Sequence, residues 1–438
     1  MEWWVSLTLI LAIMMVLMLS GMLTAYCFFI IVFAGAFFLW GGEAGFNMII
    51  LSLKSSITKF ELVPIVLFVL MGSIMTQSKM AFRMVNAVNK LLGRLPGRLA
   101  LVAIVAGTIF AAISGSAVAS TAMLGTALTP QMEQVGYKKQ MSLGPIMGAG
   151  CLDVLIPPSG LAIFIAVIAQ VSSGRFLVAI IVPGLIMAGL FFLYILIRCS
   201  IDPSLAPDYE MEKTPWKDKL LTIGKDIMPL SIIVLLVTGI IVFGIATPSE
   251  AAATGCLATL IMVIIYREFD FKNITAILKQ TVRVSGMILL VIASATAFSQ
   301  ILTFTQASTG LVNYVLSLHL QPLVLVAVIQ IIVIILGMPM PVAPLIMIIL
   351  PLTMPIITAV GLDQIWYVTV ILINAELSNL TPPFGTVLFV MHGVAPKGTN
   401  MGDVFRASVP FCCLQLVIML LIFAFPILVN WLPNLAGF

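Results

Sequence analysis

Charged residues are scarce in this sequence. Asp, Glu, Lys and Arg make up only 9% of the 438 residues, while 61% of the residues are hydrophobic. Soluble domains carry about 25% charged residues, so this chain has too few charges to cover a surface that faces water. Apolar runs of roughly 20 residues, the length that a helix needs to cross a bilayer, recur along almost the whole sequence. The composition therefore predicts an all-α polytopic membrane protein.

Motifs typical of enzymes and metalloproteins are also missing. The six cysteines show no CxxC spacing and only two histidines occur, so we expect neither a zinc site nor a disulfide framework. No GxxxxGK[ST] phosphate loop is present, which excludes that route to ATP hydrolysis within this chain. We expect no enzyme and no nucleic-acid partner. Energy for any work that the chain does must then come from an ion gradient or from another subunit.

The apolar runs predict about ten transmembrane helices and two re-entrant hairpins. Segments 99–131 and 322–355 are long for one span, and each is interrupted in its middle, at Ser114-Gly115-Ser116 and at Gly337-Met338-Pro339-Met340-Pro341. We expect each segment to return to the side from which it enters, with the interruption at its tip. The predicted spans are 4–20, 22–40, 62–78, 141–170, 176–198, 229–246, 249–266, 285–305, 366–393 and 405–431. No Lys or Arg precedes the first span, which favours a retained helix over a secretory signal.

Basic residues are distributed unevenly between the two sides of this predicted topology. One face holds 18 of the 21 Lys and Arg residues, in segments 79–98, 132–140, 198–228, 267–283 and 394–406. Only Lys54, Lys59 and Arg175 lie opposite. Because cytoplasmic loops are enriched in Lys and Arg, this face is predicted to be cytoplasmic and both termini to lie outside.

Two halves of the chain are related by a shift of 225 residues. Without gaps, the shift places Pro130 on Pro355, Gly136 on Gly361, Pro157-Pro158 on Pro382-Pro383, and Gly160 on Gly385. Five full spans separate the hairpins, and this odd number gives the halves opposite orientations, as in the inverted repeats of secondary transporters. We expect a first repeat over 1–198, a cytoplasmic linker over 199–228 and a second repeat over 229–438. The amphipathic stretches 43–60 and 267–283 correspond under the shift and are either surface helices or ordinary loops.

Four interruptions of apolar helices are the candidate functional sites: the two hairpin tips and the two Pro-Pro breaks, within 155–160 and 379–385. Broken helices persist in lipid where they line a cavity or pack in protein, because unpaired backbone groups there are costly. Proline has no N–H group to donate, so each Pro-Pro break leaves backbone carbonyl groups unpaired near the middle of a span. Such carbonyl oxygens, together with nearby hydroxyl groups, are suitable ligands for Na⁺. The helix halves that begin at the breaks direct N–H groups into one space, which favours a carboxylate or sulfonate. The alternative is that proline and glycine only kink packed helices.

Acidic residues inside spans are functional candidates because charge is costly in lipid. Asp153 and Glu376 each precede a Pro-Pro break and either bind a cation or proton or make interhelical hydrogen bonds. Glu250 follows Thr247-Pro248-Ser249, a pattern typical of a capped helix start, and is predicted to be structural.

Six segments together carry a family resemblance: 95–97, 114–116, 136–137, 155–159, 246–252 and 381–385. Through them the sequence resembles the large membrane subunit of the tripartite ATP-independent periplasmic (TRAP) transporters along essentially its whole length. The resemblance implies Na⁺-coupled uptake of a small organic anion, a carboxylate or sulfonate, across the bacterial inner membrane with two or more Na⁺. It also implies a periplasmic substrate-binding protein, a small four-helix membrane subunit in the surrounding lipid, and an elevator motion.

The resemblance also implies which residues bind the ions and the substrate. The implied Na⁺ ligands are Ser114, Gly115, Ser116, Cys151, Asp153, Ile156, Gly337, Met338, Asn379, Thr381 and Pro382. The implied substrate contacts are Ser116, Ser159, Gly160, Pro339, Thr381, Phe384 and Gly385. Where the family usually has a Gly-Thr-Leu-Gly-like run, this sequence has Gly150-Cys151-Leu152-Asp153, so a hydroxyl is lost and a carboxylate is gained.

Three other functions compete with this prediction. A proton-coupled anion transporter would use Asp153 or Glu376. A channel or a proton-pumping subunit is less favoured, because such pumps need Lys, His and Glu chains through the bilayer and this chain has no mid-membrane Lys or His. A scaffold subunit would use the breaks only to shape an interface.

Overall fold

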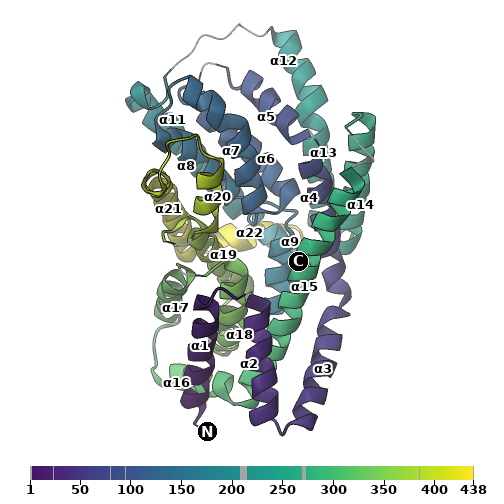
Figure 1. Ribbon diagram of the computed structural model, residues 1–438, viewed down its shortest axis with the longest axis vertical. Coiled ribbons are helices and arrows are strands. Elements are labelled where there is room, and N and C mark those ends of the chain that lie inside the picture. Colours follow the sequence, from purple (N-terminus) through teal and green to yellow (C-terminus); the bar gives the residue numbers. More distant parts are fainter. Residues whose placement is uncertain are drawn as a thin grey trace.

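The computed structural model describes residues 2–22, 24–78, 80–93, 95–207, 215–268, 273–338, 340–383 and 385–437, and every regular element in these ranges is a helix (Figure 1). The first half contains α1 Trp3–Leu19, α2 Thr24–Phe38, α3 Glu43–Ile57, the 3-10 helix η1 Phe60–Leu62, α4 Val63–Gln77, α5 Met80–Leu91, α6 Arg98–Ser114, α7 Ala117–Gln134, α8 Lys139–Gly150, α9 Gly160–Ala169, α10 Ser173–Ala179 and α11 Ile181–Ile201. The second half contains α13 Met228–Val242, α14 Pro248–Ile265, α15 Ile274–Phe304, α16 Ala307–Ser317, α17 Pro322–Gly337, α18 Val342–Val360, α19 Gln364–Leu380, α20 Thr386–Val394, α21 Met401–Ala424 and α22 Ile427–Leu435. Between the halves lie η2 Pro203–Leu205, α12 Trp216–Thr222 and the π-helical turn η3 Ile223–Ile227.

Seven helices of the described residues are long and apolar enough to cross a membrane. Five shorter apolar helices accompany them, and these include three that end or begin at a predicted interruption: α6, α9 and α17. A hairpin or broken helix is built from such half-spans, since its arms need not cross the whole bilayer. The all-α polytopic fold predicted from composition is confirmed.

The helix ends follow local sequence signals. Gly115 ends α6 with φ of 58°, a conformation that glycine adopts without a steric penalty. The Ser116 side chain then accepts a hydrogen bond from the N–H of Ala119 and caps α7. At α14, Thr247 and Glu250 form a reciprocal capping box. This confirms the structural role that the sequence predicts for Glu250.

Two sequence predictions about helix bounds are wrong. The stretch 267–283 is not a separate surface helix or loop, because its residues from Ile274 onward form the first turns of the 31-residue α15. No proline interrupts this helix, whereas in the first half Pro64 starts α4 anew after α3. The predicted last span, 405–431, is divided into α21 and α22, with Pro426 between them.

Helix bounds in the two halves repeat at the spacing seen in the sequence. Helix α7 begins at Ala117 and α18 at Val342, while α8 begins at Lys139 and α19 at Gln364, each pair 225 residues apart. Gly136 and Gly361 both follow a helix with positive φ, 86° and 74°. We propose on this basis that the chain is two repeats joined by the segment 199–228.

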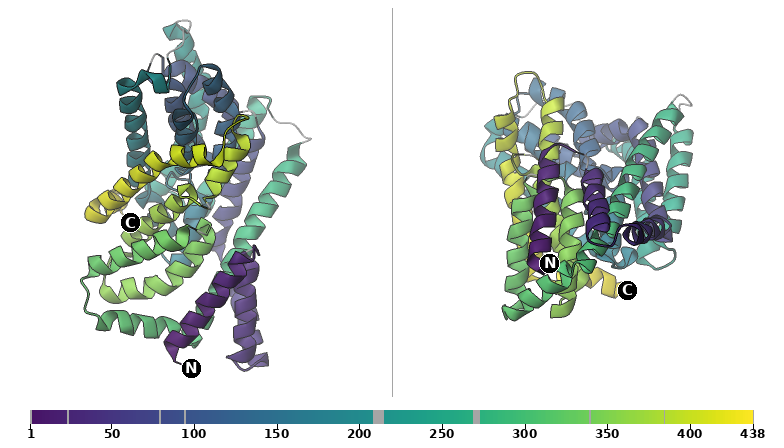
Figure 2. Two further views of the ribbon diagram at one scale, coloured as in Figure 1. Left: turned by 60° about the vertical axis from the view of Figure 1, so that its left-hand side comes forward. Right: turned by 60° about the horizontal axis from the view of Figure 1, so that its bottom comes forward.

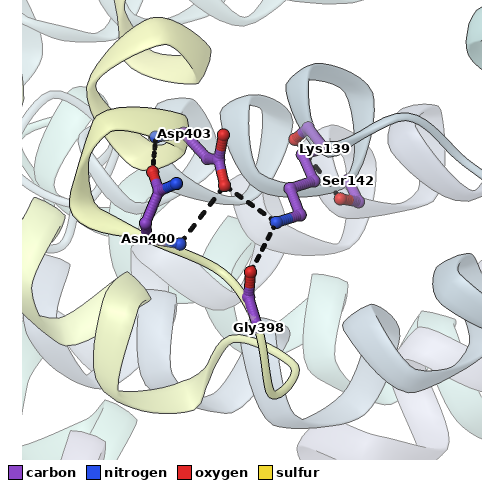
Figure 3. A network of polar contacts seen from close by, with 5 residues as sticks. All are labelled: Lys139, Ser142, Gly398, Asn400 and Asp403. Carbon is purple, nitrogen blue, oxygen red and sulfur yellow. Dashed lines mark hydrogen bonds and ion pairs between the residues drawn. The ribbon is translucent and has the colours of Figure 1, made fainter.

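Polar contacts join the described parts of all five basic segments at one end of the molecule. Arg83 pairs with Asp226 at 2.8 Å and with Glu268 at 3.7 Å. Lys138 donates to Ser204, and Lys139 pairs with Asp403 and donates to the carbonyl of Gly398 (Figure 3). In Figure 1, α5, α11 and α12 lie at the end of the long axis opposite the N-terminus. The five segments share a face, as the topology requires, and its cytoplasmic assignment stays a prediction.

Candidate transport site

The tip of the first hairpin is held by its own serines. The hydroxyl of Ser114 lies 3.0 Å from that of Ser120 and accepts a hydrogen bond from the N–H of Ser116. Helix α4 packs closely on the tip, since a Cβ atom at Gly72 would lie 2.7 Å from the carbonyl oxygen of Ser114. The tip residues 114–116 are half-buried, and their hydroxyl and carbonyl oxygens hydrogen-bond within the tip.

The first broken helix passes directly against this hairpin. Gly150 ends α8 where any side chain would collide with the Thr121 hydroxyl of α7. Residues 151–159 then form a buried irregular segment, and the Ser159 side chain caps α9 by accepting a hydrogen bond from Ala162. The carbonyl of Pro157, freed by the break, accepts a hydrogen bond from Thr238 of α13. The interruption between α8 and α9 is therefore packed against other parts of the protein.

The second broken helix carries a buried polar chain. Asn379 donates to Glu376 at 3.0 Å and accepts from Thr386, the first residue of α20, at 2.8 Å. The break between Leu380 and Thr386 is thus bridged by side chains. These contacts fix the Glu376 carboxylate near the end of α19.

A cavity of about 240 Å³ lies where the first tip and both broken helices meet. The first residues of three helices line it: Ala117 of α7, Gly160 of α9 and Thr386 of α20. Helix N-termini carry unpaired N–H groups and the positive end of the helix dipole. The cavity therefore offers an environment for an anion, and helices α4 and α15 close its other walls.

Two carboxylates, Asp153 and Glu376, also line this cavity. Asp153 is 1% exposed and Glu376 is fully buried, and the two interact electrostatically. Asp153 Oδ1 and Glu376 Oε1 have no hydrogen-bond partner in the part of the chain that the structure describes. The described lining contains no Lys, Arg or His. A buried carboxylate without a basic partner is costly to ionise, so this pair calls for a cation or a proton.

The structure gathers some of the predicted site residues and separates others. Those that line the cavity are Ser114, Gly115, Ser116, Asp153, Gly160 and Asn379. Those that do not are Cys151, Ile156, Ser159, Gly337, Met338, Thr381, Pro382 and Gly385. The predicted contacts Pro339 and Phe384 lie outside the described residues.

The second hairpin tip is placed against a helix. A Cβ atom at Gly337 would lie 2.8 Å from the Cβ of Ser378 on α19. Two turns before Gly337 on α17 and one turn before Ser378 on α19, the Asn374 side chain donates to the side-chain oxygen of Gln330 at 2.7 Å. Gly337 therefore serves close packing of α17 on α19 in this structure.

Several lining residues were missed at the sequence level. Ser73 and Thr76 of α4 and Gln280 of α15 face the cavity, and Gln280 also bonds Gln77 at 3.1 Å. Small polar residues on otherwise apolar spans were the available signal, yet such residues more often serve helix packing. Glu376 was recognised as a candidate, but the role of Thr386 depends on tertiary contacts.

The fold and the cavity together define a class: a polytopic membrane transporter whose site is built from interrupted helices. Residues 11–428 match the family described as "Tripartite ATP-independent periplasmic transporter, DctM component". The chain belongs to this family, the large membrane subunits of TRAP transporters, and is a multi-pass protein of the inner membrane.

Curated relatives cover most of the chain. One is a C4-dicarboxylate TRAP transporter large permease protein of Pseudomonas aeruginosa, 30% identical over 379 residues, which are 86% of this chain and 87% of the relative. Another is an ectoine/5-hydroxyectoine TRAP transporter large permease protein of Ruegeria pomeroyi, 27% identical over 406 residues, or 92% and 93% of the two chains. The relatives are thus transporter permeases with differently named substrates.

Solved structures support the fold. The YdaH transporter of Alcanivorax borkumensis superposes with a TM-score of 0.60 at 15% identity over 87% of this chain and 89% of its own. The MtrF protein of Neisseria gonorrhoeae gives 0.59 at 12% identity, over 86% and 83%. At these identities the similarity concerns architecture alone.

Proposed function

We propose that this chain carries a small organic anion, a carboxylate or sulfonate, inward across the membrane together with Na⁺. The observation that carries the proposal is a single cavity lined by three helix N-termini, a hydroxyl-bearing hairpin tip and two buried carboxylates. Such a cavity has features for an anion and for a cation in the same space.

The anion is best accommodated by the starts of α7, α9 and α20. Their unpaired N–H groups donate to carboxylate or sulfonate oxygens without adding a fixed positive charge. A site without a basic side chain binds an anion weakly until cations are present. This property suits a transporter, because the substrate must also be released.

The cations are best accommodated by the oxygens of Ser114, Ser116, Asp153 and Glu376. An organic anion added to two carboxylates would give at least three negative charges in a water-poor space. Two or more Na⁺ would offset most of this charge, and substrate binding would then require the ions. The charge balance of the cavity thus supports coupling between substrate and Na⁺.

The other parts of the proposal rest on the family. A periplasmic binding protein would deliver the substrate, a small four-helix membrane subunit would bind beside this chain, and the hairpins and broken helices would move as one block. Relatives named for C4-dicarboxylates and for ectoine make both substrate classes worth testing. Ectoine-like zwitterions would place a positive group beside the carboxylates.

The test is uptake into proteoliposomes that contain the chain and its small subunit. Candidate substrates are a C4-dicarboxylate, a sugar acid, a hydroxysulfonate and ectoine, each with its binding protein and an inward Na⁺ gradient present or absent. We expect one class of substrate to be taken up, and only when its binding protein and the Na⁺ gradient are both present. Uptake without a binding protein would contradict the tripartite part of the proposal, and uptake indifferent to Na⁺ would contradict the coupling.

A second candidate is proton coupling, favoured by the unpartnered oxygens of Asp153 and Glu376. Protonation would neutralise these carboxylates as effectively as Na⁺ binding. The same vesicles distinguish the two, because a pH gradient without Na⁺ would then drive uptake. The paired variant Asp153→Asn with Glu376→Gln would abolish this drive while Ser114→Ala would leave it unchanged.

A further inference from the structure

A second polar pocket, of about 440 Å³, lies at the basic end of the molecule, away from the transport cavity. It is formed where α8 begins, where α11 ends with η2, and where α21 begins. Its lining is Lys138, Lys139, Gln140, Arg198, Asp202, Leu205, Asp403 and Arg406. The proposed transport function assigns no role to this pocket.

Hydrogen bonds and an ion pair connect the walls of the pocket, and they neutralise part of its charge. Lys139 pairs with Asp403 at 2.8 Å, and Asp403 also caps α21 together with Asn400 (Figure 3). The backbone N–H of Lys138 donates to the carbonyl of Leu205 at 3.0 Å, and its ammonium donates to Ser204. These contacts join three elements that are distant in sequence, so the pocket has a defined shape.

The remaining charge is positive. Four basic side chains face two acidic ones, and Lys139 already neutralises Asp403. A hydrogen bond from the Ser204 hydroxyl lowers the pKa of Asp202, which therefore stays ionised near neutral pH. Arg198 and Arg406 are exposed, and within the described residues neither makes a hydrogen bond or a salt bridge, but Arg198 interacts electrostatically with Asp202 and Arg406 with Asp403. Two guanidinium groups are thus available for a phosphate, the anion that they bind with matched geometry.

Apolar surface continues from both arginines along the helices. On α21 the exposed side chains after Arg406 follow at helical spacing, at Val409, Cys413, Val417 and Leu420. On α11 the exposed apolar side chains that precede Arg198, and so lie on its membrane side, are Leu193 and Ile197, 50% and 49% exposed. A ligand with a phosphate head and hydrocarbon chains would match both the pocket and these faces. A free phosphate would occupy the pocket alone, and competition by inorganic phosphate distinguishes the two ligands.

We propose that this pocket binds the headgroup of an anionic phospholipid, with its acyl chains along α11 and α21. The pocket lies on the predicted cytoplasmic face, where basic sites between transmembrane helices meet anionic headgroups. The lipid would bridge α11 and α21, and through Lys138 it would also contact the start of the first broken helix. Its binding is independent of substrate and of Na⁺.

The test compares two double variants. The pocket variant combines Arg198→Gln and Arg406→Gln, and the control variant combines Lys279→Gln and Arg283→Gln. Both double variants lose two exposed basic groups from the same face, but the second pair lies outside the pocket. Lys139 is left intact because its ion pair holds the wall. Retention of phosphatidylglycerol is measured by native mass spectrometry, and affinity by titration into detergent-purified protein.

We expect the pocket variant to bind phosphatidylglycerol roughly 30-fold more weakly, which corresponds to about 1 kcal/mol for each arginine. The control variant and phosphatidylcholine binding should be unchanged. Equal weakening in both variants would assign the effect to general surface charge and overturn the proposal. Full competition by inorganic phosphate would instead indicate a soluble anion site, and displacement by the small membrane subunit would indicate a protein interface; either result excludes the lipid.

Discussion

The two halves of this protein use the same backbone device with different side chains. Helices α8 and α19 start 225 residues apart and both end before a Pro-Pro break. Their carboxylates are not equivalent, because the 225-residue shift aligns Asp153 with Ser378 and Glu376 with Cys151. The first hairpin tip lines the cavity, whereas Gly337 of the second packs on α19. The positions of the helix breaks thus follow the 225-residue shift, whereas the side chains at the breaks differ between the halves.

Removing the carboxylates should give the largest effect. We expect Asp153→Asn and Glu376→Gln each to reduce Na⁺-driven uptake by about 10- to 100-fold, since a contact with a charged group contributes about 1.5–3 kcal/mol. Uptake in proteoliposomes measures this, with thermal unfolding as the control for folding. Full activity of either variant would show that only one half carries the cation.

The two hairpin tips should respond differently to a methyl group. Gly337→Ala overpacks against Ser378 and should lower stability by about 1–3 kcal/mol without changing the Na⁺ dependence of uptake. Gly115→Ala has space around its Cβ but positive φ, and should cost about 1 kcal/mol while weakening Na⁺ dependence. Unfolding temperature and Na⁺ titration of uptake separate the two effects. Equal changes in stability and in Na⁺ dependence for the two variants would argue against a different role for the two hairpin tips.

Hydroxyl loss should distinguish the Na⁺ ligands predicted in the first half from those predicted in the second half. Ser114 lines the cavity, while the Thr381 hydroxyl donates to the Leu377 carbonyl at 2.7 Å and lies outside the lining. We expect Ser114→Ala to raise the half-saturating Na⁺ concentration about fivefold, as for a contact of about 1 kcal/mol, and Thr381→Ala to have a smaller effect. A larger effect at Thr381 would place the main ion site at the second half.

Loss of a helix cap should have the smallest effect on transport. Ser159 is fully buried and caps α9, whereas no side chain caps its counterpart α20. Ser159→Ala should lower stability by about 1 kcal/mol and leave substrate affinity unchanged. Thermal unfolding and the concentration dependence of uptake measure the two quantities. Weaker substrate binding with unchanged stability would restore Ser159 as a substrate contact.

Much of this architecture was predictable from the sequence. Glycine, proline and serine report local backbone geometry, so the tip at Ser114–Ser116 and the Pro-Pro breaks were located correctly. The capping role of Glu250 followed from its neighbours for the same reason. The continuity of α15 was not predicted, because amphipathic character over 267–283 does not reveal whether a helix stops before the next apolar run.

The site itself was only partly predictable. Backbone signals located three of the interruptions that form the cavity, but they did not show that the second tip lies apart from it. The walls from α4 and α15 depend on tertiary packing, and Ser73 or Gln280 has no distinguishing local pattern. Asp153 and Glu376 come from different halves of the chain, and the sequence does not show that these two side chains line the same cavity.

Binding of radioactive Na⁺ to the purified chain tests the central claim most directly, that the cavity joining both broken helices holds the coupling ions. Wild type, Ser114→Ala and Glu376→Gln are compared, with Thr247→Ala at the α14 cap, outside the cavity lining, as the control. The account predicts saturable Na⁺ binding in wild type and control, weakened in Ser114→Ala and lost in Glu376→Gln. Wild-type Na⁺ binding in both cavity variants, with folding intact, would contradict it.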